Sequence, residues 1–132
     1  MYTMRKAAEL AGMNYDTLKF YCKEGLVPNV KRDKNNYRLF SDDNIVWLKS
    51  LQCFKQSGMS ISELHNFMQL CIDGKETLNE RIDLLEKQKA HLEQEIESIR
   101  DNIAYINHKV EIYQAMLDGR IEYVNKLAPQ DK

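Results

Sequence analysis

The C-terminal half of the sequence repeats apolar residues at alternating steps of four and three. The series runs from Leu78 to Leu117 and is broken once, at Lys89. Its other members are Ile82, Leu85, Leu92, Ile96, Ile99, Ile103, Ile106, Val110 and Tyr113. Heptads with charged flanks predict a coiled-coil helix, and residues 76–117 would span roughly 60 Å at ~1.5 Å per residue. Nothing else in 132 residues can cover such a seam, so the pattern predicts a homodimer paired through residues 76–117.

The charge of the chain is divided unevenly between its two ends. Residues 1–40 hold eight Lys or Arg and four Asp or Glu, a net charge of +4, whereas the rest carries −5, giving −1 overall. A basic head on an acidic stalk is typical of a protein whose one end meets a polyanion. The sequence has no secretory signal and no apolar run of about 20 residues. We therefore expect a cytoplasmic protein with no membrane partner.

The cysteines indicate neither disulfides nor a metal site. Cys22, Cys53 and Cys71 are odd in number and widely spaced, which predicts reduced thiols rather than a disulfide framework. The chain has no C-x-x-C and no paired His, so no metal is expected. It also lacks a Gly-rich phosphate loop and any suggestive Cys–His spacing. We expect no cofactor and no enzymatic activity.

The first forty residues carry the pattern of a winged helix-turn-helix. Thr3 can cap a first helix that ends at Gly12, and Asn14 can cap a second that ends at Gly25. Two short helices joined by a turn this tight form a helix-turn-helix. Residues 29–40 alternate around a polar, basic turn and predict a β-hairpin.

Three further helices are predicted after the hairpin. One runs from Ser41 to Gly58, and a second covers residues 61–72 behind a capping box. The third, short one covers residues 120–127 and would pack Ile121, Val124 and Leu127. The expected fold is mainly α: a winged helix-turn-helix head over residues 1–74, a coiled-coil dimerisation helix over 75–118, and a short C-terminal helix and tail over 119–132.

Residues 2–67 resemble the N-terminal domain of the MerR family of transcription regulators. The resemblance lies in several motifs in the right order: Tyr2-Thr3, Ala7-Ala8-Glu9-Leu10-Ala11-Gly12, Thr17-Leu18-Lys19-Phe20-Tyr21, Gly25-Leu26-Val27-Pro28, Asn36-Tyr37-Arg38-Leu39-Phe40 and Gly58-Met59-Ser60-Ile61-Ser62-Glu63. The chain departs from the family at Lys19-Phe20-Tyr21-Cys22, where Arg-Tyr-Tyr-Glu is usual. Lys keeps the charge of Arg but not its forked donors.

The resemblance implies a sequence-specific regulator whose homodimer forms an antiparallel coiled coil. It implies double-stranded promoter DNA as a partner, with RNA polymerase at the same promoter, and activation by bending and untwisting the DNA. The family's DNA contacts carry over to two groups of residues. On the second helix these are Tyr15, Thr17, Lys19, Phe20 and Tyr21. On the hairpin they are Lys31, Arg32, Tyr37 and Arg38. For the second helix alone, an ordinary amphipathic surface helix is the competing interpretation.

The effector of such a regulator is harder to predict. No Cys follows Cys71, so the metal site of the family's metal sensors cannot be built. Drug-sensing members append a separate ligand-binding domain, and here only about fifteen residues follow the long helix. We therefore expect neither class. Residues 51–61 resemble the segment around the single sensing Cys in the AdhR/NmlR-like branch, which responds to aldehydes and to nitrosative or electrophile stress.

Cys53 is therefore the candidate effector-sensing residue. It lies off the stripe of Trp47, Leu48, Leu51 and Phe54 that we expect to face the core. Lys49, one turn earlier, could favour the reactive thiolate. The alternatives are a packed, unreactive Cys53, a small organic ligand held between head and coiled coil, or a coiled-coil adaptor protein without a sensor role.

Overall fold

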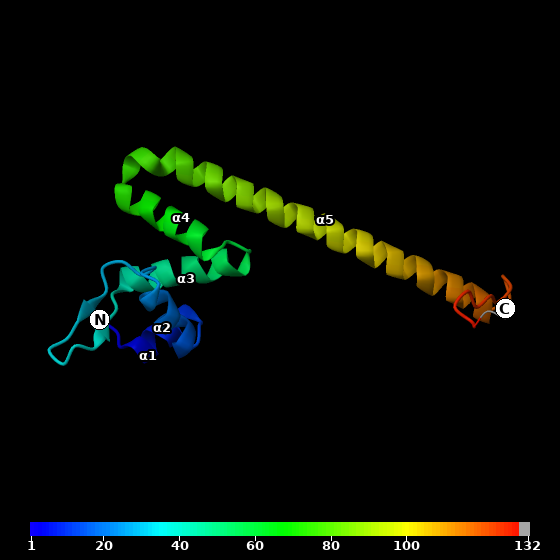
Figure 1. Ribbon diagram of the computed structural model, residues 1–132, viewed down its shortest axis with the longest axis horizontal. Helices are drawn as coiled ribbons and strands as arrows, with labels where there is room; N and C mark the ends of the chain where they lie inside the picture. The colour runs from blue at the N-terminus through cyan, green and yellow to red at the C-terminus, as the bar shows by residue number, and fades with distance from the viewer. Residues whose placement is uncertain (130–132) are drawn as a thin grey trace. The chain divides into compact units, whose positions relative to one another are not determined.

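The computed structural model describes residues 1–129. These residues form two compact units, Met1–Lys89 and a second that begins at Ala90. The elements, in chain order, are α1 (Met4–Ala11), α2 (Tyr15–Lys23), β1 (Lys31–Arg32), β2 (Arg38–Leu39), α3 (Asp42–Gln56), α4 (Ile61–Asp73), a 3-10 turn (Lys75–Thr77) and α5 (Leu78–Leu117) (Figure 1). The mainly α fold predicted from the sequence is confirmed.

Side-chain caps fix the helix-turn-helix. The Thr3 hydroxyl accepts a hydrogen bond from the Lys6 N–H at 3.2 Å, and the Asn14 side chain accepts one from the Thr17 N–H at 2.7 Å. Between the helices Gly12 adopts φ 73°, a left-handed conformation that costs glycine little. Both predicted helix starts and the tight turn are confirmed.

The wing is a short antiparallel hairpin that the N-terminus extends. Lys31 pairs with Leu39, and Arg32 pairs with Arg38. Tyr2 then forms a bridge with Phe40, through backbone hydrogen bonds of 2.7 and 2.8 Å. The hairpin was predicted, but its connection to the N-terminus was not, since pairing between residues so distant in sequence leaves no local signal.

One core holds α1 to α4 together. Its fully buried side chains include those of Leu18, Leu26, Phe40, Leu48, Leu51, Met59 and Leu64. The indole N–H of Trp47 donates to the Leu26 carbonyl at 2.7 Å, and the Asn44 amide donates to the Pro28 carbonyl at 2.9 Å. These two bonds tie the segment before the wing to α3. Helices α1 and α3 contact each other, so α1, α2 and α3 are packed as one head (Figure 1).

A polar cluster reverses the chain between α4 and α5 (Figure 1). Thr77 is buried, and its hydroxyl contacts the carbonyl oxygens of Leu70 and Gly74. The Arg81 guanidinium donates to Thr77 Oγ1 at 2.9 Å and to the Gly74 carbonyl at 2.6 Å. These bonds satisfy carbonyls that the end of α4 leaves without a helical partner. The cluster fixes where α5 begins.

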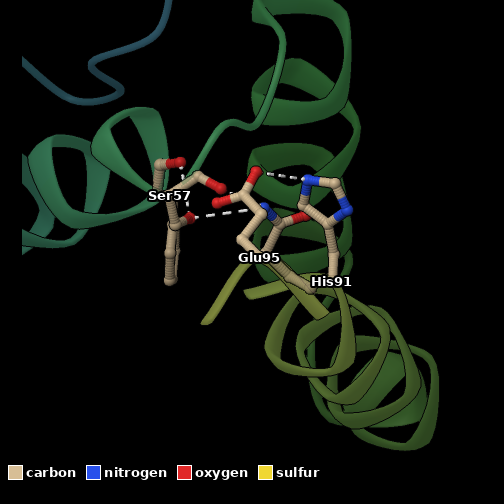
Figure 2. Close-up of polar contacts among 5 residues, drawn as sticks. Ser57, His91 and Glu95 are labelled. Carbon is tan, nitrogen blue, oxygen red and sulfur yellow. Dashed lines mark hydrogen bonds and ion pairs between the residues drawn. The ribbon is translucent and has the colours of Figure 1, made fainter. Parts of the chain in front are cut away.

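Helix α5 is a single helix whose apolar seam is exposed. It starts two residues later than predicted, after the 3-10 turn, and ends at Leu117 as expected. None of its residues is buried; Ile96, Ile99, Ile103 and Ile106 are 47–60% exposed. His91 and Glu95 form an exposed ion pair at 3.0 Å (Figure 2), which contributes little to stability. No helix within residues 1–129 has the length and apolar character needed to cross a membrane.

The predicted helix over residues 120–127 is wrong. Helix α5 ends at Leu117, Gly119 follows with φ 76°, and residues 120–127 hold bends, irregular backbone and a turn but no helix. Ile121 and Val124 are exposed, and Leu127 is 93% exposed. Eight residues are too few to form a stable helix by themselves; Val124 and Leu127 instead line a hollow beside Tyr113 of α5. The last three residues of the predicted tail lie outside the described residues.

We predict that Thr77→Val lowers the free energy of unfolding by about 1–3 kcal/mol, because the methyl group leaves the Arg81 donor and two carbonyls without their partner. The test is urea unfolding followed by circular dichroism at one fixed protein concentration. Ser62→Ala, which removes an exposed hydroxyl on α4, is the control and should change stability little. Equal stability of the two variants would contradict the role given to Thr77.

Candidate nucleic-acid interface

One side of α2 presents polar and aromatic side chains to solvent. Tyr15 is 49% exposed and Phe20 is 45% exposed, Lys19 is exposed, and Thr17 is half-buried. The opposite side carries Leu18, which is fully buried. A helix held from behind with donors and ring edges outward has the form that a DNA major groove accepts.

Tyr21 lies elsewhere than the family resemblance implied. It is 3% exposed and belongs to the core, and burial raises the pKa of its hydroxyl. It stands three residues after Leu18 and therefore on the same side of the helix. The prediction placed Tyr21 among the contacting side chains, but the structure leaves almost none of it at the surface.

The predicted basic residues of the wing lie on its two strands, on either side of the turn. Lys31, Arg32 and Tyr37 are exposed, and Arg38 is half-buried. An Asp33 carboxylate oxygen accepts hydrogen bonds from the N–H groups of Asn35 and Tyr37 at 2.8 and 3.0 Å. Arg32 donates to the Asn36 carbonyl at 2.8 Å. The turn is therefore held by its own side chains.

A hollow of about 340 Å³ separates the wing from the starts of α1 and α2. Four of the predicted contacts line it: Tyr15 of α2, and Arg32, Tyr37 and Arg38 of the wing. Arg5 of α1 lines it as well. The sequence prediction did not name Arg5, although a basic residue in the first turn of a helix is an available signal because the helix dipole disfavours a cation there.

The positive charges of the wing act on Cys22, a residue of α2. Burial raises the pKa of the Cys22 thiol, while the positive charges of Arg38 and Arg32 oppose that shift. Burial likewise raises the pKa of Cys71, against the charge of Arg81. Thiolate is the nucleophilic form of cysteine, so both side chains are weak nucleophiles at neutral pH.

Cys53 is the exposed thiol of the three. Leu48 and Leu51 are fully buried on the other side of α3, which confirms the predicted core face. The Cys53 carbonyl accepts the Ser57 N–H at 3.0 Å, and the Ser57 carbonyl accepts a hydrogen bond from Gln88 of α5 at 2.5 Å (Figure 2). Cys53 thus stands one helical turn before a direct bond between α3 and α5.

The segment around Cys53 also borders α2. A second hollow, of about 580 Å³, is lined by Thr17 and Phe20 of α2 and by Gln52, Lys55 and Gln56 of α3. Tyr21 lines it as well, so three of the predicted DNA contacts border the same hollow as the immediate neighbours of Cys53. A change in the position of this end of α3 would alter the support of α2.

Comparison with known proteins gives consistent matches. Residues 2–71 match the family model described as MerR HTH family regulatory protein. An uncharacterized HTH-type transcriptional regulator of Haemophilus influenzae is 39% identical over 125 residues, which cover 94% of this chain and 93% of the relative. The HTH-type transcriptional regulator AdhR of Bacillus subtilis is 29% identical over 87 residues, 66% of this chain and 62% of the relative.

Two solved structures share the fold along nearly the whole chain. HiNmlR, a MerR family regulator lacking the sensor domain and crystallised with promoter DNA, is 38% identical with a TM-score of 0.75, over 89% of this chain and 93% of that one. A MerR family regulator from Bacillus thuringiensis is 27% identical with a TM-score of 0.73, over 85% and 98%.

We predict that a maleimide reagent at about pH 7 modifies Cys53 several-fold faster than Cys22 and Cys71, because Cys53 is exposed, whereas the other two thiols are half-buried and have raised pKa values that leave little thiolate at that pH. Raising the pH should accelerate labelling of Cys22 and Cys71, since their raised pKa values place thiolate formation in more alkaline solution. Peptide mass spectrometry after timed quenching measures each rate. All three thiols should react alike in urea. Slower labelling of Cys53 in the native protein would contradict its exposure.

Proposed function

The chain belongs to the MerR family of helix-turn-helix regulatory proteins, and we propose that it is a homodimeric regulator that binds promoter DNA and activates transcription by distorting it. The observation that carries this proposal is the shared surface of the exposed side of α2 and the basic wing, which meet at one hollow. The relative HiNmlR, which has a similar fold over most of its length, was crystallised with promoter DNA.

In this proposal α2 enters the major groove and the wing follows the phosphate backbone. Tyr15, Thr17, Lys19 and Phe20 would contact base edges and nearby phosphates, as a recognition helix does. Lys31, Arg32, Tyr37 and Arg38 would contact phosphates, which set position rather than sequence preference. Because Lys19 is a point charge without the fork of Arg, it would contribute attraction with less directional selectivity.

The exposed seam of α5 supports the proposal of a dimer. Its isoleucines from Ile96 to Ile106 are about half exposed, and a contiguous exposed apolar stripe of this kind is typical of an interaction surface. We assign DNA binding to residues 1–74 and pairing to residues 75–118, in antiparallel order. Two heads at a fixed spacing would bind two half-sites of a pseudo-palindrome. Bending the DNA between them costs about 1–6 kcal/mol and would present the promoter to RNA polymerase in altered form.

We predict that Arg38→Ala and Lys19→Ala each weaken binding to an operator duplex, selected from a random pool by the wild-type protein, by about tenfold, because each removes a charged contact. The slope of log affinity against log salt should fall by about 0.9 per lost phosphate contact. Fluorescence anisotropy across a salt series measures both quantities.

The control is Lys75→Ala, which removes an exposed charge from the 3-10 turn rather than from the interface. Its affinity and salt slope should match those of the wild type. If Arg38→Ala and Lys19→Ala bind as the wild type does, the interface lies elsewhere.

The signal that such a regulator answers is, in our proposal, an electrophile that modifies Cys53. Its exposure permits attack, and the Ser57–Gln88 bond lies one turn away. With an α,β-unsaturated aldehyde, the Cys53 thiolate sulfur bonds to the β-carbon, the alkene electron pair moves to the α-carbon, and water supplies the proton there. No oxidant is consumed. The bulky adduct on α3 would then disturb both α5 and the hollow shared with α2.

We predict that acrolein increases promoter activation by the wild-type dimer in a purified transcription assay, and that Cys53→Ser abolishes the increase while binding the operator normally. Cys71→Ser, which removes a half-buried thiol, is the matched control and should respond as the wild type does. An equal response of Cys53→Ser would rule out the thiol and favour a reversibly bound organic ligand, whose effect would disappear on dialysis.

A further inference from the structure

The hollow between the wing and α1 has an imbalance of charge. Arg5, Arg32 and Arg38 line it, and Asp33 is its single carboxylate. The Asp33 carboxylate already accepts two backbone N–H groups of the turn. Within residues 1–129 neither Arg5 nor Arg38 forms an ion pair. The arginines therefore outnumber the acid, and the acid's hydrogen-bonding capacity is partly used.

All three arginines occupy positions that folding alone disfavours. Arg32 stands directly opposite Arg38 in the hairpin, and like charges facing each other across two strands are destabilising. Arg5 lies in the first turn of α1, which contains no acidic residue, so its charge faces the positive end of the helix dipole. An anion bound between them would attract all three guanidinium groups and so offset these unfavourable interactions.

The walls of the hollow also indicate which kind of anion it takes. Tyr15 and Tyr37 flank it, are 49% and 70% exposed, and offer hydroxyl groups as neutral donors. Tyr15 is also the first residue of α2, the helix that we place in the major groove. A strand whose bases meet α2 would therefore carry its backbone past this opening. A phosphodiester in a chain fits this position better than a free ion.

We propose that this hollow binds one backbone phosphate of the DNA, and that Arg5, together with Arg38, supplies the charge that holds it. This inference rests on the proposed DNA-binding function and adds α1 to the contacting elements. The phosphate would connect α1, the start of α2 and the wing across a single group. Arg5 would thereby fix the register of the head along the strand without selecting a base.

The test uses the full-length dimer and the operator duplex selected by the wild type. Arg5→Ala should bind about tenfold more weakly, and its salt slope should fall by about 0.9. Arg5→Lys should keep the slope because it keeps the charge. Lys6→Ala is the matched control, since Lys6 is its neighbour on α1 but pairs with Glu9 at 3.7 Å and does not line the hollow; its affinity and slope should equal those of the wild type.

A methylphosphonate scan then locates the phosphate. Neutralising one particular linkage in each half-site should weaken the wild type and Lys6→Ala strongly, but Arg5→Ala clearly less, because that variant has already lost one of the two charges that hold the phosphate. If Arg5→Ala keeps the wild-type salt slope, or if every neutral linkage affects it as it affects the wild type, the phosphate site is overturned while DNA binding stands. A wild-type dimer that selects no duplex at any salt concentration would overturn the proposed function itself.

Discussion

The side chain of Asn44 fixes the position of the segment before the wing against the start of α3. It is 5% exposed, and its amide oxygen accepts the Ser41 N–H at 2.9 Å while its amide nitrogen donates to the Pro28 carbonyl, also at 2.9 Å. One buried group thus begins α3 and anchors the segment that leads into the wing. Trp47, one turn later, repeats the attachment at Leu26. The distance between α2 and the wing, and therefore the shape of the whole basic surface, depends on these bonds, and losing a partner of a buried amide is costly.

Much of this architecture could be predicted from local sequence, because local physics determines it. Thr3, Asn14 and Ser60 cap helices where the sequence places them, and the heptads of α5 recur over enough residues to define one helix. The failures share a different cause. The Tyr2–Phe40 bridge joins residues far apart in the chain, and the apolar residues after Gly119 predicted a helix in a segment too short to form one by itself. At Tyr21 the local pattern was the better guide. Its spacing from Leu18 indicated burial, which the structure shows, whereas the family resemblance indicated a DNA contact.

The composition of the candidate interface could be predicted from the sequence, but its geometry could not. Charge, pattern and the family resemblance pointed to the wing and to the exposed side of α2. The sequence did not indicate that α1 meets the wing, because Arg5 and Arg38 are brought together only by the hairpin and by the bridge between Tyr2 and Phe40. For Cys53 the pattern predicted the correct face of α3. Its link to α5 depends on Gln88, a residue with no distinguishing motif.

The turn of the wing has a consequence for the thermodynamics of binding. Asp33 and Arg32 close this turn with side-chain hydrogen bonds to the backbone of Asn35, Asn36 and Tyr37. A loop that met DNA as a disordered segment would lose conformational entropy at that moment, at a cost subtracted from affinity. Here the ordering takes place when the chain folds. The wing is preorganised, so the cost of ordering this loop is not subtracted from the attraction between its cations and a phosphate backbone.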